Sequence, residues 1–221
     1  MKKNRNITVE GITFDKQILK ACGENGVIRR AYFNADEKEV VATNGIILLI
    51  EKVENPIKQE SGYFDLVIPK ETKHTRKDYL KGNDILYQWI IERDSLSFPE
   101  YKRFFNDIGD EYQGKDVLKD SFEWVHSWNI AILNEDDWSL TSKSVQKYFY
   151  MPVINTVFDQ KYFKIVKEFF DDINTATFYF DNSKAPLIIK QGNKSASFMP
   201  MNVELPSEYV KFEKKKAILI K

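Results

Sequence analysis

Residues 183–203 read SKAPLIIKQGNKSASFMPMNV, and this stretch says most about the fold. Branched apolar residues from Leu187 to Ile189 precede a polar corner at Gly192-Asn193, and a second run returns from it, which is the pattern of a β-hairpin. Pro200 cannot donate a ladder hydrogen bond, so the sheet must end or become an edge there. Methionine is typical of adaptable docking surfaces, and Met199 and Met201 flank this proline. We therefore predict an antiparallel hairpin that ends in a peptide-binding patch.

The composition favours a globular protein without a global charge signal. The chain has 221 residues, 43% of them apolar, and its 33 basic and 33 acidic residues cancel, so a nucleic-acid partner would have to be recognised by local patches. Cys22 is the only cysteine; we expect a small buried hydrophobe in a reducing compartment. The start of the chain lacks an apolar leader pattern and no window reaches 18 apolar residues, so we expect a cytoplasmic protein without a membrane partner.

Hydrophobic periodicity gives a coarse series of elements. Helices are expected at 14–22, 117–133 and 159–173, the last with Tyr162, Val166, Phe169 and Ile173 as one apolar stripe. Turns are expected at Asp36-Glu37 and, most strongly, at Asn44-Gly45. Besides the hairpin quoted above, strands are expected at 7–9, 27–34, 39–43, 46–53, 63–68, 84–93, 95–101, 138–140, 145–153 and 175–180.

The order of these elements predicts an α+β fold made of two related domains on antiparallel sheets. Residues 106–116, NDIGDEYQGKD, contain two glycines and no periodicity, which indicates a linker. We expect one domain at 1–107, a linker at 108–116, a second domain at 117–203 and an extension at 204–221. That extension is either a strand that closes the subunit or a frayed tail.

Residues for catalysis are sparse. His74 and His126 have no metal-ligand spacing, and no phosphate-binding glycine loop is present. Two acidic groups could in principle hold magnesium but lie in expected turns: Glu135-Asp136-Asp137 and Asp107, Asp110, Glu111. We expect no enzyme activity, no metal and no cofactor, with a small metal-dependent nuclease as an open alternative.

Four segments resemble, in order, those of bacterial DNA polymerase sliding clamps. They are Ala42–Leu48 (ATNGIIL), Phe98–Arg103 (FPEYKR), Phe158–Tyr162 (FDQKY), and Ala185-Pro186 together with Met199–Met201. The resemblance implies the DNA clamp fold: repeated domains, each with two helices and antiparallel sheets, that form a ring around duplex DNA without sequence choice. It also implies a clamp loader and a hydrophobic pocket for short peptides of DNA polymerase and repair enzymes. Carried over position by position, that pocket would use Thr43, Leu48, Pro99, Arg103, Phe104, Tyr162, Pro186, Met199, Pro200 and Met201.

The chain departs from the pattern of that family in size and in several residues. Ile46 and Ile47 stand where the family has a His-Arg pair, and Asn202 stands where arginine is usual. The usual bacterial subunit has three domains, whereas this chain has room for two. Under the resemblance, three copies would make a six-domain ring, so we expect a homotrimeric processivity factor in DNA replication.

A sliding ring needs basic residues on its inward helices for weak phosphate contacts. Candidates are Lys16, Lys20, Lys73, Arg76, Lys77, Lys81, Lys161, Lys164 and Lys167. The expected helix at 117–133 is a counterexample, because Asp116, Asp120 and Glu123 make it acidic. That acidic helix favours a second interpretation, in which the chain is an adaptor or decoy that binds replication proteins without closing a ring.

Overall fold

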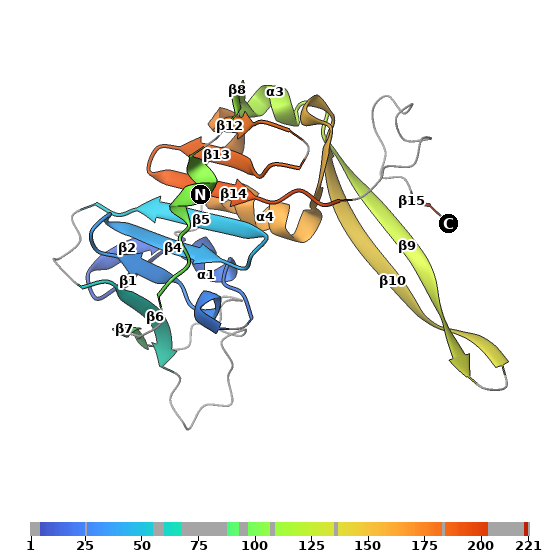
Figure 1. Ribbon diagram of the computed structural model, residues 1–221, viewed down its shortest axis with the longest axis horizontal. Coiled ribbons are helices and arrows are strands. Elements are labelled where there is room, and N and C mark those ends of the chain that lie inside the picture. Colours follow the sequence, from blue (N-terminus) through green and yellow to red (C-terminus); the bar gives the residue numbers. More distant parts are fainter. Residues whose placement is uncertain are drawn as a thin grey trace.

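A nine-stranded sheet dominates the computed structural model, which describes residues 5–24, 26–54, 60–67, 88–92, 97–106, 109–134, 137–182, 184–202 and 219–220. The strand order is β7-β6-β3-β4-β5-β14-β13-β12-β8, and every neighbouring pair is antiparallel. Figure 1 shows this sheet in blue, cyan, teal, green and orange, with the helices beside it. The α+β class with antiparallel sheets is confirmed.

The sheet joins the two halves of the sequence edge to edge. The first half supplies β3 (Tyr32–Asn34), β4 (Glu39–Thr43), β5 (Ile47–Lys52), β6 (Gly62–Val67) and β7 (Gln88–Glu92). The second half supplies β8 (Asp110–Gln113), β12 (Thr177–Phe180), β13 (Leu187–Gln191) and β14 (Lys194–Phe198). Strands β5 and β14 meet at the junction, with Phe198 opposite Ile47.

Both strong hairpin signals are confirmed. Between β4 and β5, Gly45 has a φ of +87°, which favours glycine. The Asn44 side-chain oxygen accepts hydrogen bonds from the amides of Ile46 and Ile47, both at 2.9 Å. The second hairpin turns at Gly192, which also has a positive φ, and aligns β13 with β14.

Helices cover one face of the sheet, which we call the helix face. The helices are α1 (Gln17–Lys20), α3 (Gly114–Leu118) and α4 (Gln160–Phe169), and a hairpin of β1 (Asn6–Val9) and β2 (Ile12–Asp15) packs beside them. One core cluster joins all of these to the sheet. Short 3₁₀ turns occupy Gly26–Arg29, Lys102–Phe105, Pro152–Ile154 and Ile173–Thr175.

A second sheet of four strands runs away from this body. Its order is β11-β10-β9-β15, formed by β11 (Thr156–Asp159), β10 (Asp137–Met151), β9 (Phe122–Asn134) and β15 (Leu219–Ile220). Most of the β9–β10 hairpin projects from the body as a long two-stranded arm (Figure 1). The expected strands at 138–140 and 145–153 both fall in β10. The second is shorter than expected, because β10 ends at Met151 and Pro152 starts a 3₁₀ turn.

Helix α4 follows the apolar stripe that its sequence predicts. Phe163, Val166 and Phe169 are buried, and the Asp159 side chain caps the N-terminus by accepting the Lys161 amide at 2.7 Å. The helix ends at Phe169, because Phe170 is extended with a ψ of 152°. Residues 173–175 of the predicted helix form a separate 3₁₀ turn.

The predicted helix at 117–133 is wrong. Helix α3 ends at Leu118, and β9 occupies the range from Phe122 onward. The apolar residues there fit a helical period, but the segment is also rich in aromatic and β-branched residues, which favour strands. Pairing with β10 along the whole strand decides between the two. His126 therefore lies in a strand rather than on a helix.

Three other expectations differ from the structure. The predicted helix at 14–22 keeps only Gln17–Lys20, because Phe14 lies in β2. The predicted strand at 27–34 begins as a 3₁₀ turn and becomes a strand only at Tyr32. Residues 97–101 of the strand predicted at 95–101 have no strand pairing.

Part of the predicted linker is regular structure. Within 106–116, Asp110–Gln113 form β8, which pairs with β12 as an edge of the large sheet, and α3 starts directly after it. Gly114 donates its amide to the Ala176 carbonyl at 2.9 Å, and a Cβ at this position would lie 2.3 Å from the Ile173 oxygen. The division into two clamp-like domains remains a prediction.

Candidate peptide and nucleic-acid interfaces

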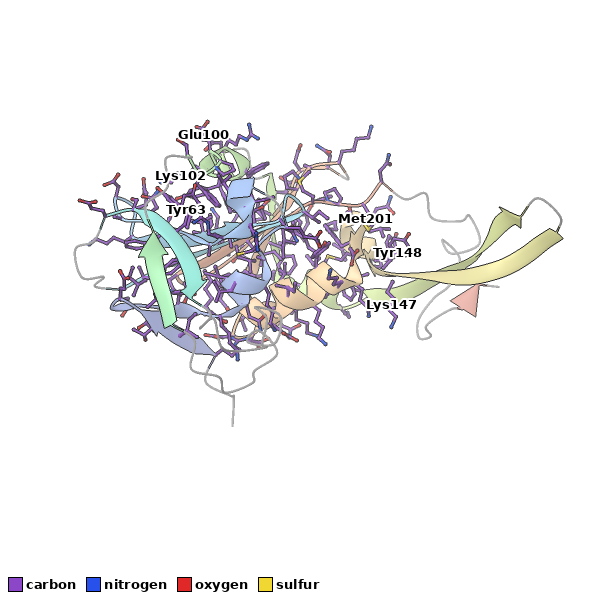
Figure 2. The ribbon with its side chains drawn as sticks, turned by 90° about the horizontal axis from the view of Figure 1, so that it is seen from below. Tyr63, Glu100, Lys102, Lys147, Tyr148 and Met201 are labelled. Carbon is purple, nitrogen blue, oxygen red and sulfur yellow. The ribbon has the colours of Figure 1, made fainter. Side chains whose placement is uncertain are left out.

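The face of the sheet opposite the helices is crossed by residues 97–106, which we call the connector. It leads from the first half of the chain to the second, and Figure 2 shows its Glu100 and Lys102 on the other side of the sheet from α4. The Phe98 ring stacks on Tyr32, with centroids 5.1 Å apart and planes 6° apart. Tyr101 inserts into the small cluster beneath, which contains Val41, Leu48, Ile50, Tyr101 and the partly buried Phe98, Phe104 and Phe105.

The Tyr101 hydroxyl pins the connector to the sheet. It donates to the Glu39 carboxylate at 3.0 Å and accepts from the Asn34 amide at 3.0 Å. Burial raises the pKa of Tyr101, and the charge of Glu39 raises it further. The hydroxyl therefore stays protonated and keeps a buried carboxylate hydrogen-bonded, as buried polar groups require.

The structure brings together most of the predicted peptide-binding residues at the junction of the two half-sheets. Thr43 lies opposite Leu48, and Phe104 packs on the same cluster as Leu48. The Met199 amide donates to the Ile46 carbonyl at 2.8 Å. Pro186 precedes Leu187, which pairs with Phe198, so it lies beside Met199. We name Thr43, Leu48, Phe104, Pro186 and Met199–Met201 the junction patch.

Three other predicted peptide-binding residues lie at or beyond the rim of this patch. Pro99 is exposed on the connector, and the Arg103 guanidinium lies over the Phe104 ring at 5.1 Å. Tyr162 instead packs against the core on the helix face. The Met201 amide donates to the Val157 carbonyl at 2.8 Å, so the end of the patch turns toward β11, and Figure 2 shows Met201 and Tyr148 at this end of the body.

Helix α4 presents the predicted DNA-binding lysines to solvent. Lys161, Lys164 and Lys167 are all exposed, and they recur on the side away from the buried stripe. Beside them is a cavity of about 1020 Å³, whose lining adds Arg5 and Lys147. Acidic residues Asp159, Glu168 and Asp171 also line it, so the lining has five basic and three acidic side chains.

The other DNA-binding candidates differ in their surroundings. Lys20 is engaged with Glu168, its Nζ 3.5 Å from the carboxylate oxygen, which ties α1 to α4. Lys16 is half-buried directly before α1. The remaining basic candidates, Lys73, Arg76, Lys77 and Lys81, lie outside the described residues, as does His74.

A buried ion network on the helix face holds the two halves together. Asp15 is fully buried, and its carboxylate contacts Lys194 Nζ at 3.2 Å and Arg5 at 3.3 Å. Lys194 also donates to the Phe169 carbonyl at 2.9 Å, at the end of α4. The Asp15 amide in turn donates to Glu51 at 2.8 Å, and burial raises the pKa of Glu51.

Arg5, Lys147 and Lys194 were not among the sequence-based candidates. Lys194 directly follows a hairpin corner, a position typical of a solvated residue, and the packing of β2 and of the end of α4 against the sheet buries it. A prediction of one continuous strand at 137–151 would have made Lys147 a candidate basic residue beside α4, because β10 pairs with the strand that leads into that helix.

In the described part of the chain, no group of three or more His, Cys, Asp or Glu residues is arranged to hold a metal ion. Asp110 and Glu111 of the candidate acidic group lie on strand β8. In the same part of the chain, no helix has the length and apolarity that a membrane crossing needs.

Solved structures of bacterial sliding clamps match the chain over most of its length. The DNA polymerase sliding clamp of Bacillus subtilis is 11% identical with a TM-score of 0.49, and the match covers 86% of this chain and 61% of that one. A putative DNA polymerase III beta subunit from Eubacterium rectale is 13% identical with a TM-score of 0.49, covering 85% and 62%. The chain resembles bacterial sliding clamps in structure. A further match is the Helicobacter pylori beta clamp bound to a DNA ligase peptide, at 11% identity and a TM-score of 0.46, covering 85% and 62%.

The chain spans about three fifths of the length of these sliding clamps. No family model matches the sequence, and no curated protein matches it.

Proposed function

We propose that this protein is a DNA sliding clamp: a ring-forming, non-enzymatic processivity factor that holds replication proteins on duplex DNA. The junction patch carries the proposal. Residues distant in sequence, at 43–48, 104, 186 and 199–201, meet where the two half-sheets join. Apolar side chains on an edge that ends in Met-Pro-Met suit a short peptide with one or two apolar anchors.

The basic face of α4 supports the DNA-binding part of the proposal. Exposed lysines that touch phosphates without reading bases would let a ring slide. The long acidic helix that favoured a non-ring adaptor is not formed, because α3 ends at Leu118 and β9 occupies Phe122–Asn134. Replacing Lys161, Lys164 and Lys167 together by glutamate should abolish binding to duplex DNA of any sequence in a filter-binding assay at low salt. A triple change to glutamine should weaken binding less, and unchanged affinity in the glutamate variant would remove α4 from the DNA path.

A peptide-binding experiment tests the junction patch directly. The probe is a fluorescein-labelled Gly-Ser peptide with adjacent Leu and Phe anchors, measured by anisotropy. Changing both Met199 and Met201 to lysine should lower its affinity at least tenfold, because the anchors would face charged side chains. Lys184→Ala is a matched control, because Lys184 is exposed near Pro186 but outside the patch. Equal binding by wild type and the double variant, with unchanged thermal melting, would show that the patch is not the peptide site.

The mass in solution separates the ring from the adaptor. Light scattering coupled to size exclusion should give three times the 26.0 kDa of one chain for a homotrimer. A single-chain mass at all concentrations would leave an adaptor that binds peptides without encircling DNA.

A further inference from the structure

A second cavity lies on the connector face, beside the junction patch. Its volume is about 430 Å³. Strand register places Lys190, Ser195 and Ile50 in one row across its floor, with Glu39 and Lys52 as the next pair. The connector supplies the other wall with Tyr101, Lys102, Phe105 and Asn106, and Gly192 and Asn193 close one end. We call this space the lysine cavity.

Cations dominate the lysine cavity. Its lining contains three lysines but one carboxylate, Glu39, and that carboxylate is buried and accepts a hydrogen bond from Tyr101. Lys102 pairs with Glu37, whose pKa is lowered mainly by this contact. Among the described residues, no carboxylate lies within 4.0 Å of the amino group of Lys52 or Lys190, although the charge of Lys52 makes a small further contribution to the lowered pKa of Glu37. Two amino groups are therefore available to an anion.

Lys190 is held in place by aromatic rings. Its Nζ lies 5.2 Å from the centre of the Tyr179 ring and 5.9 Å from that of Phe105. Rings keep the ammonium group partly desolvated without neutralising its charge. A carboxylate that enters the cavity would meet this charge with less screening than at an open surface.

The lysine cavity and the junction patch share a wall. Leu48 and Ile50 point to the same face of β5, about 7 Å apart by strand geometry. The 3₁₀ turn Lys102–Phe105 separates the two sites. Lys102 and Phe105 line the cavity, whereas Phe104, with the Arg103 guanidinium over its ring, belongs to the junction patch. An extended peptide anchored at the patch could cross this turn within roughly four residues.

We propose that the lysine cavity binds an acidic side chain of the partner peptide whose apolar anchors occupy the junction patch. This inference rests on the proposed peptide-binding function and adds a specificity rule to it. The partner carries Asp or Glu a few residues from its apolar anchors. The recognition is a carboxylate meeting Lys190 and Lys52, with the Ser195 hydroxyl as a further donor.

Matched peptides test this rule. The first is the Leu-Phe peptide above; others carry one Asp two, three, four or five residues from the anchors on either side, and a parallel set carries Lys. At low salt we expect the best Asp peptide to bind wild type about tenfold tighter than the neutral peptide. This gain should shrink as salt rises, and the Lys peptides should bind no better than the neutral one.

Variants locate the effect. Lys190→Ala combined with Lys52→Ala should remove the gain from Asp while leaving the neutral peptide bound as before. Lys190→Glu combined with Lys52→Glu should reverse the preference toward the Lys peptides, which a merely destabilised protein would not do. Lys184→Ala should retain the gain.

The outcomes separate the two proposals. Equal binding of neutral and Asp peptides by wild type, or a gain that survives the double alanine change, overturns the lysine cavity and leaves the patch intact. If no peptide binds, both proposals fail. If Asp peptides bind through Lys190 and Lys52, and the variant with Met199 and Met201 changed to lysine binds them as tightly as wild type, the link between the cavity and the junction patch is wrong.

Discussion

The two faces of the nine-stranded sheet are covered to very different extents by the rest of the chain. The helix face is covered by α1, α3, α4 and the β1–β2 hairpin, and it contains a large apolar core and a buried ion network. The connector face is covered over part of its width by residues 97–106, above a small aromatic cluster. The helix face therefore holds the fold together, whereas the connector face leaves amino groups and apolar edges within reach of a partner.

Substituting two lysines of the same hairpin gives the strongest test of this difference between the two faces. Lys194 points to the helix face and bonds Asp15 and the Phe169 carbonyl; Lys190 points to the connector face. Lys194→Ala should lower the free energy of unfolding by about 3 kcal/mol, because it leaves a buried carboxylate short of a partner. Lys190→Ala should cost less than about 1 kcal/mol, because it loses only contacts with the rings of Tyr179 and Phe105. Urea denaturation measures both, and equal losses would contradict the assignment of roles to the two faces.

A tyrosine tests how firmly the connector is held. Tyr101→Phe removes the hydroxyl that bonds Glu39 and Asn34, and we expect a loss of roughly 1–3 kcal/mol because a buried carboxylate loses its donor. Tyr112→Phe is the control, because the Tyr112 hydroxyl has no hydrogen-bond partner among the described residues, and it should stay within about 0.5 kcal/mol of wild type. A Tyr101→Phe variant as stable as its control would mean that apolar packing alone holds the connector.

The smallest effect concerns pH and Glu51 on the helix face. Burial raises the pKa of Glu51 above its ordinary value of 4.5, and the charges of Asp15 and Asp171 act in the same direction, against Lys194 and the Asp15 amide. A raised folded-state pKa means that the protonated acid is favoured by folding. This contribution is complete below 4.5 and is lost as the pH rises through the folded-state pKa.

Glu51→Gln keeps an acceptor for the Asp15 amide and removes the charge. The stability of wild type relative to this variant should therefore fall as the pH rises from 4.5 and level off once Glu51 is ionised. Denaturation curves at a series of pH values measure the difference. Parallel pH profiles for the two proteins would show that Glu51 does not titrate differently on folding.

The segments predicted correctly are those whose local sequence allows one answer. Asn44-Gly45 between apolar runs and the 183–203 stretch specify hairpins through turn chemistry, and α4 follows from a cap and a buried stripe. The 117–133 range failed because its apolar spacing fits both a helix and a strand, and only the pairing of β9 with β10 resolves it. For the same reason the edge strand β8 looked like a linker: its few polar residues gain structure from β12.

The sequence by itself determined the α+β class and the two hairpins that meet at the junction, because turn propensity and hydrophobic period act over a few neighbouring residues. The tertiary structure decided which residues meet. It buried Lys194 against Asp15, left Lys190 at the surface, and laid the connector over Leu48 and Ile50. Those outcomes depend on contacts between segments far apart in the chain, and no local pattern encodes them.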